Sequence, residues 1–110
     1  MSDKMGDNQR LVHIVEAIAE IEKYTIGVEL SEFKNNSMIR FATIKQIEII
    51  GEAAKNISEI TRNKYPEIEW REIAGLRNIL VHEYFGIDPQ LIWQIVEVDI
   101  PLLKERLKVV

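Results

Sequence analysis

Apolar residues recur at three- and four-residue intervals along most of this chain, and no segment alternates with the two-residue period of a strand. Such spacing places apolar side chains on one face of an amphipathic helix. Near the start of the chain the pattern is formed by Leu11, Ile14, Val15, Ile18 and Ile21. Four long helices are predicted in this way, over residues 8–25, 37–60, 72–85 and 89–108.

Glycine and proline residues mark where these helices end and begin. Gly27 is expected to end the first helix, and Gly86 the third. Asp88 and Pro89 are the residue types preferred at the N-cap and the first helical position, so the fourth helix is expected to begin there. Pro101 lies inside that helix, where it removes a hydrogen bond and predicts a kink.

Gly51 lies in the middle of the second predicted helix, where glycine costs about 1 kcal/mol relative to alanine. Because glycine lacks a Cβ atom, we expect a neighbouring backbone to pass close to it. The fold class is therefore predicted to be all-α, an up-and-down bundle of four long helices with short additional turns. We expect one domain over residues 1–110, with the polar residues 1–7 disordered.

The composition limits the kinds of protein that this chain can be. Its 110 residues suffice for one modest core, and the absence of cysteine excludes disulfides, thiolate metal sites and cysteine nucleophiles. There is neither a signal-peptide pattern nor an apolar run of about 18 residues, so a cytoplasmic protein without membrane contact is expected. The formal net charge of −4 argues against an extended nucleic-acid surface. An RNA site would have to be small and basic, or shared between subunits.

The third predicted helix carries a string of polar residues suited to chemistry on a phosphodiester: Arg77, Asn78, His82 and Tyr84. At about 100° per residue, Arg77, Asn78 and His82 face away from the apolar side of the helix. The imidazole can accept or donate a proton near neutral pH, and the guanidinium offers a fork of donors to a phosphate. Asn78 could hold His82 or a phosphate oxygen. The plainer interpretation is helix capping and surface polarity, since cations suit helix C-termini.

Apolar residues flank this string on the same outward side. Val81 and Phe85 face away from the predicted core, which favours a partner surface over solvent. The simplest partner is a second copy related by a two-fold axis. Such a homodimer would bring two copies of the string together in one cleft.

Other polar residues have less specific interpretations. His13 lies on the polar flank of the first helix and is expected to face solvent. Glu48 and Glu52 are one turn apart, but the Glu-x-x-His repeats of di-iron bundles are absent. They are expected to form a solvated stripe, with the alternative that Glu52 orients Arg77. Six basic residues could line an RNA path, although most are expected to be ordinary surface charge: Arg40, Lys45, Lys55, Arg62, Lys64 and Arg71.

Three blocks of the sequence resemble the HepT-like toxins of the HEPN superfamily. They are IEIIGEAAK at 47–55, YPEIEWREIAG at 65–75 and LRNILVHEYFG at 76–86, and the resemblance extends over roughly residues 8–108. It implies a small helical bundle that forms a homodimer, with an R-x4-H site in the cleft between protomers. Members are metal-independent RNases, some of which act as toxins, so no cofactor is expected.

The resemblance also assigns roles to individual residues. It gives Arg77 and His82 the catalytic positions, and Asn78 the polar position after the arginine. The expected partner is a minimal nucleotidyltransferase antitoxin of the MntA type, which can transfer AMP to the motif tyrosine, here Tyr84. The leading hypothesis is therefore a metal-independent endoribonuclease toxin of a type II toxin–antitoxin pair. The alternative is a non-catalytic, nucleotide- or partner-binding subunit of a nucleotidyltransferase complex.

Overall fold

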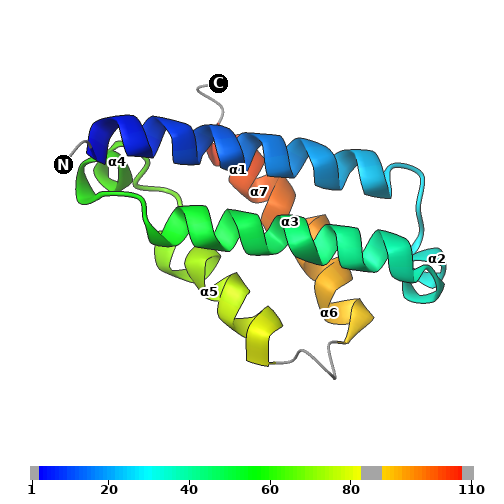
Figure 1. The fold of residues 1–110 in the computed structure, drawn as a ribbon. Coiled ribbons are helices and arrows are strands. Elements are labelled where there is room, and N and C mark those ends of the chain that lie inside the picture. The colour runs from blue at the N-terminus through cyan, green and yellow to red at the C-terminus, as the bar shows by residue number, and fades with distance from the viewer. Residues whose placement is uncertain (1–2, 83–87, 108–110) are drawn as a thin grey trace.

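Helix α3 (Ser37–Lys55) lies between α1 (Asp3–Thr25), which runs antiparallel to it, and α5 (Trp70–His82), which crosses it obliquely (Figure 1). The computed structural model describes residues 3–82 and 88–107. The remaining elements are α2 (Leu30–Asn35), α4 (Glu59–Lys64), α6 (Pro89–Gln94), the π-helical turn η1 (Ile95–Asp99) and α7 (Ile100–Arg106).

Four long helical segments form the bundle, because α6, η1 and α7 follow one another as a single path. Two short helices, α2 and α4, connect the others, and the described residues contain no strand. The prediction of an all-α bundle of four long helices with short additional turns is confirmed. None of the helices in the described ranges is both long enough and apolar enough to cross a membrane.

One hydrophobic core joins the long helices. On α5 the side chains of Leu76 and Leu80 are buried in it. Burying a leucine or isoleucine side chain contributes about 1.5–3 kcal/mol to stability. The largest fully buried apolar side chains are Ile14, Ile21, Phe33, Ile47, Ile50, Leu80 and Ile92.

Two helix ends lie where the capping residues predicted them. Gly27 follows α1 with a φ of 72°, a left-handed conformation that glycine adopts without a steric penalty. Asp88 is the N-cap of α6, where its carboxylate accepts a hydrogen bond from the backbone N–H of Gln90 at 3.0 Å. Pro89 occupies the first helical turn. The expected stop at Gly86 lies outside the described residues.

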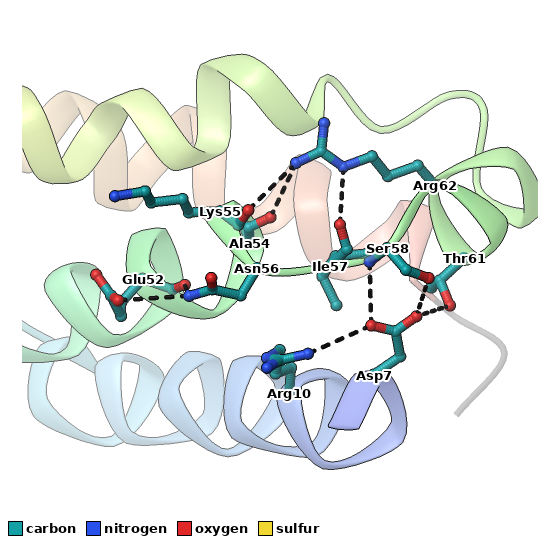
Figure 2. A network of polar contacts seen from close by, with 10 residues as sticks. All are labelled: Asp7, Arg10, Glu52, Ala54, Lys55, Asn56, Ile57, Ser58, Thr61 and Arg62. Carbon is teal, nitrogen blue, oxygen red and sulfur yellow. Dashed lines mark hydrogen bonds and ion pairs between the residues drawn. The ribbon is translucent and has the colours of Figure 1, made fainter. Parts of the chain in front are cut away.

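The prediction of one helix over residues 37–60 is wrong at its C-terminal end, because a break separates α3 from α4. At this break the guanidinium of Arg62 donates hydrogen bonds to the backbone carbonyls of Ala54 and Ile57, at 3.4 and 3.2 Å (Figure 2). These carbonyls lie at the end of α3, where a helix leaves acceptors without partners.

The last two predicted helices also differ in detail. The third begins at Trp70 rather than residue 72, and its expected end at 85 lies outside the described residues. In the fourth, the disturbance expected at Pro101 takes the form of the π-helical turn η1 immediately before it. Proline has no N–H to donate and its ring crowds the carbonyl four residues earlier, and a widened turn accommodates both effects.

At Gly51 the backbone of α5 passes close to α3, as its position in mid-helix predicted. A Cβ atom built on Gly51 would lie 2.8 Å from the Cβ of Arg77 and 3.1 Å from the Arg77 backbone nitrogen. No larger residue fits there without a shift of one helix. Gly51 therefore fixes the position of the Arg77 backbone against α3.

The first turn of α1 departs from the sequence-based expectation. The helix begins at Asp3 instead of residue 8, and so includes residues 3–7 of the segment for which disorder is expected. Asp7 within this turn is only 2% exposed, which is unusual for an aspartate.

The Asp7 carboxylate is stabilised by partners from a distant part of the chain. It accepts hydrogen bonds from the backbone N–H of Ser58 at 3.0 Å and from the hydroxyl groups of Ser58 and Thr61 (Figure 2). The guanidinium of Arg10 lies 3.6 Å away. A buried carboxylate of this kind is tolerated because both of its oxygens have donors. The contact holds the start of α1 against α4.

This network predicts how stability responds to acid. Burial by itself would raise the pKa of Asp7, but the hydrogen bonds from Ser58 and Thr61, together with the charge of Arg10, lower it below its ordinary value. The pKa in the folded state is then below the unfolded value of about 3.9. The stability that the ionised group supplies is complete above that value and is lost as pH falls through the folded pKa.

We expect Asp7→Asn to lower the free energy of unfolding at neutral pH by about 1–3 kcal/mol and to flatten its dependence on pH in the acid range. Urea denaturation at several pH values from about 7 down to about 3 measures both effects. Glu16→Gln, at an exposed position on the same helix, is the control and should leave the curve unchanged. Parallel acid curves for Asp7→Asn and the wild type would refute this role of Asp7.

Candidate functional site

Arg77 lies in the middle of α5, opposite Gly51, and is held by an ion pair. Its Nε atom is 3.1 Å from Oε1 of Glu52, and its side chain is 40% exposed. Glu52 directly follows Gly51. The glycine that allows the α5 backbone to approach α3 is therefore adjacent to the glutamate that pairs with Arg77. At this exposure the pair contributes at most about 1 kcal/mol to stability, so its main effect is orientation of the guanidinium. Glu52 was expected either to belong to a solvated stripe or to orient Arg77, and the ion pair supports the second alternative.

Glu52 is itself fixed from a second side. Its Oε2 atom accepts a hydrogen bond from the side-chain amide of Asn56 at 3.4 Å, and the same amide donates to the Glu52 carbonyl at 3.0 Å (Figure 2). Arg77 uses its Nε atom for Glu52. The two terminal nitrogens of a guanidinium held in this way can bind the oxygens of a phosphate group.

The other residues of the predicted string are described less completely. Asn78 is exposed on α5, beside Arg77. His82 is the last residue of α5, about 7.5 Å along the helix axis from Arg77, but its side chain lies outside the described residues. Tyr84 lies outside them entirely, as do Phe85 and the side chain of Val81. The catalytic and modification roles of these residues therefore remain predictions.

Arg77 also lines a groove between α1 and α3, with a volume of about 590 Å³. Hereafter this hollow is the α1–α3 groove. Six of the side chains that line it can donate hydrogen bonds. They are Gln9, Arg10 and His13 from α1, Lys45 from α3, Asn56 directly after α3, and Arg77 from α5. The volume is within the range of small-molecule and cofactor sites.

The sequence pattern did not predict this groove. His13 is exposed, as expected, but it also lines the groove together with Arg77. Glu48 and Glu52, expected to form a solvated stripe, line it too. Which residues of α1 face which residues of α3 depends on how the two helices are rotated against each other, and neither helix's own pattern contains that information.

No candidate metal centre is found in the parts of the chain that the structure describes. Those residues contain no group of three or more histidine, aspartate or glutamate side chains that could hold a metal ion. The pair formed by Glu48 and Glu52 has no third ligand of these types among them.

Comparison with known proteins identifies the family. The family profile described as "Ribonuclease HepT-like" matches residues 14–110. The chain is 45% identical over 100 residues to "Putative RNase MJ1380" of Methanocaldococcus jannaschii, a match that covers 91% of this chain and 92% of that protein. It is 42% identical over 103 residues to "Probable ribonuclease HepT" of Thermococcus cleftensis, covering 94% of each.

This chain therefore belongs to the ribonuclease HepT-like family, and the resemblance seen in its sequence blocks is confirmed. The match includes the helix that carries Arg77 and the whole of α3. No solved structure matches the chain.

Proposed function

We propose that this protein is an endoribonuclease that cleaves RNA without a metal ion, and that it acts as the toxin of a type II toxin–antitoxin pair. Family membership and the names of its relatives support ribonuclease activity. The observation that carries the proposal is the setting of Arg77. Its guanidinium is held by Glu52 at the wall of a groove large enough for a nucleotide.

In the proposed reaction, His82 and Arg77 have complementary roles. His82 accepts the proton of a ribose 2′-hydroxyl, whose oxygen then attacks the adjacent phosphorus atom. The bond from phosphorus to the 5′-oxygen breaks, and that oxygen receives a proton from a protonated imidazole or from water. Arg77 binds the non-bridging oxygens and stabilises their developing charge, while Asn78 supports His82 or the phosphate by a hydrogen bond.

A second copy of the chain completes the site in this proposal. Support comes from the outward face of α3, where Met38 and Phe41 are exposed although both are large and apolar. They recur at helical spacing with Lys45 and Glu52 and so extend the face that carries the Arg77 ion pair. An apolar face of this kind suits a homodimer in which two Arg77 side chains lie in one cleft.

The proposed antitoxin is a minimal nucleotidyltransferase of the MntA type, which transfers AMP to Tyr84. Because Tyr84 belongs to the same string as Arg77 and His82, the added nucleotide would bring bulk and negative charge to the site proposed for the RNA phosphate. Modification would thereby block cleavage. This part of the proposal rests on the resemblance of the string at 77–84 to the family's motif.

The nature of the cleavage products tests this mechanism. Because a ribose oxygen is the nucleophile, we expect the purified protein to cleave a labelled single-stranded RNA in excess EDTA. The fragments should carry 2′,3′-cyclic phosphate and 5′-hydroxyl ends, identified by mass spectrometry. An RNA of the same sequence with 2′-O-methyl groups is the control and should remain intact.

Two results would contradict the proposal in different ways. Fragments with 3′-hydroxyl ends would show that the nucleophile is not the ribose oxygen. An absence of cleavage by protein whose Tyr84 is shown by mass spectrometry to be unmodified would favour the alternative of a non-catalytic binding subunit. Such a subunit would still form a complex with its nucleotidyltransferase.

A further inference from the structure

Three donors in the α1–α3 groove have no partner in the described part of the chain: Gln9, His13 and Lys45. The side chains of His13 on α1 and Lys45 on α3 make no hydrogen bond or ion pair within the described ranges 3–82 and 88–107. Arg10 and Arg77, in contrast, are paired with Asp7 and Glu52. The side chains of Lys45 and His13 are thus available to a ligand, and both face a groove that Arg77 shares.

The groove is lined by both apolar and polar side chains. Ile49 and Ala53 line it from α3, and Ile49 packs on the hydrophobic core while still reaching the groove. Gly6 lines it from α1. A nucleotide has a matching character, since its base favours an apolar surface and its phosphate favours cationic donors.

The charge of the groove differs from that of the whole protein. The cationic side chains that line it are Arg10, Lys45 and Arg77, and the anionic ones are Glu48 and Glu52. Asp7, which pairs with Arg10 beside the groove, balances the third positive charge, so the groove is neutral in a protein with a formal net charge of −4. It therefore repels a phosphate less than the rest of this acidic protein does.

A second hollow limits the site on the side away from Arg77. It has a volume of about 660 Å³, follows the same two helices and shares His13 and Ile49 with the α1–α3 groove. Its lining includes Glu16 and Glu20, and Lys23 in it is already paired with Glu20 at 2.9 Å. A phosphate is therefore favoured between Arg77 and His13 and disfavoured beyond His13.

We propose that the α1–α3 groove binds the nucleotide of a single-stranded RNA that adjoins the scissile phosphate, with Lys45 and His13 contacting its phosphate and its base lying on Ile49 and Ala53. The identification of the ligand as RNA rests on the function proposed above. Apart from Arg77, the groove residues bind substrate and take no part in the chemistry. Arg77, which lines the groove, connects this binding site to the site of cleavage.

Binding of an RNA that cannot be cut tests the groove independently of catalysis. The probe is a fluorescent single-stranded 2′-O-methyl oligonucleotide, and its anisotropy gives Kd at several salt concentrations. We expect Lys45→Ala to raise Kd about fivefold and to reduce the slope of log Kd against log salt by about one, as for the loss of one phosphate contact. His13→Gln should raise Kd by a smaller factor, with the salt slope unchanged.

Lys34→Ala is the matched control, because it also removes one exposed lysine but from α2, outside the groove. It should change Kd less than twofold. Equal Kd values for Lys45→Ala and the wild type would overturn the proposal, as would equal losses for Lys45→Ala and Lys34→Ala. With cleavable RNA, Lys45→Ala should raise KM and leave kcat unchanged.

Failure of the groove and failure of the proposed function give different results. Cleavage of RNA together with binding that does not depend on Lys45 would overturn the groove and leave the ribonuclease. Binding that depends on Lys45, without any cleavage by the wild type, would support the groove in a protein that binds RNA but does not cut it.

Discussion

Arg77→Ala is expected to lower the rate of RNA cleavage by about 10²- to 10³-fold, the usual effect of removing a donor that stabilises developing charge. The fold should survive this substitution. The Arg77 side chain is 40% exposed and its ion pair with Glu52 is worth at most about 1 kcal/mol. Single-turnover cleavage at saturating enzyme measures the rate, and thermal unfolding checks the fold.

Two further variants make this result specific. His82→Ala should lose cleavage to a similar extent, because it removes the proposed proton acceptor. Arg77→Lys should retain only part of the rate, since an ammonium cannot bind Glu52 and a phosphate with the planar fork of a guanidinium. Arg71→Ala, an exposed arginine on the same helix, is the control and should cleave at the wild-type rate. If cleavage persisted in both the Arg77 and His82 variants, it would come from a contaminating nuclease.

Gly51→Ala and Gly75→Ala are expected to change stability in opposite directions. Both glycines lie inside helices, where alanine is favoured by about 1 kcal/mol. A Cβ atom at Gly75 meets nothing within 4 Å, so Gly75→Ala should raise the free energy of unfolding by up to about 1 kcal/mol. At Gly51 the same atom would lie 2.8 Å from the Cβ of Arg77 and 3.1 Å from its backbone nitrogen. That overlap forces α3 and α5 apart, and we expect a net loss of about 1–3 kcal/mol.

Urea denaturation of the two variants beside the wild type measures this contrast. Because the atoms displaced in Gly51→Ala belong to Arg77, cleavage should also fall, even at temperatures where the variant is fully folded. Stabilisation of Gly51→Ala by the same amount as Gly75→Ala would show that the two helices do not touch at this point.

The parts of the fold that were predictable follow from local rules. The spacing of apolar residues predicted four long helical segments, and Asp88 and Gly27 marked helix ends through capping chemistry that involves only near neighbours. Gly51 predicted that a neighbouring backbone passes close to its helix, because the stability that glycine costs within a helix has to be offset by a contact that only glycine allows.

The break between α3 and α4 was not predictable from the same rules. Ile57 and Ile60 continue the helical spacing of α3, so the apolar pattern crosses the break without interruption. The structure buries Ile57 but leaves Ile60 68% exposed. The break depends instead on Arg62, which binds carbonyls at the end of α3 after the chain has turned.

The candidate site was predictable only in part, for a related reason. Arg77 was singled out from its own helix, where its neighbours in sequence are also its neighbours in space. Its pairing with Glu52 was one of two alternatives, because that contact joins two helices. The roles of His13 and Lys45 in the groove depend on the packing of α1 on α3, which no single helix specifies.

The burial of Asp7 also bears on where this domain begins. The amphipathic pattern starts at Leu11, so a shortened chain would reasonably be designed to begin at residue 8. Asp7, whose carboxylate accepts hydrogen bonds from Ser58 and Thr61, would then be removed. The backbone N–H of Ser58 and the hydroxyl groups of Ser58 and Thr61, more than fifty positions later in the sequence, would lose their acceptor. The apolar stripe of α1 thus begins at Leu11, whereas the part of α1 that the fold requires begins no later than the polar residue Asp7.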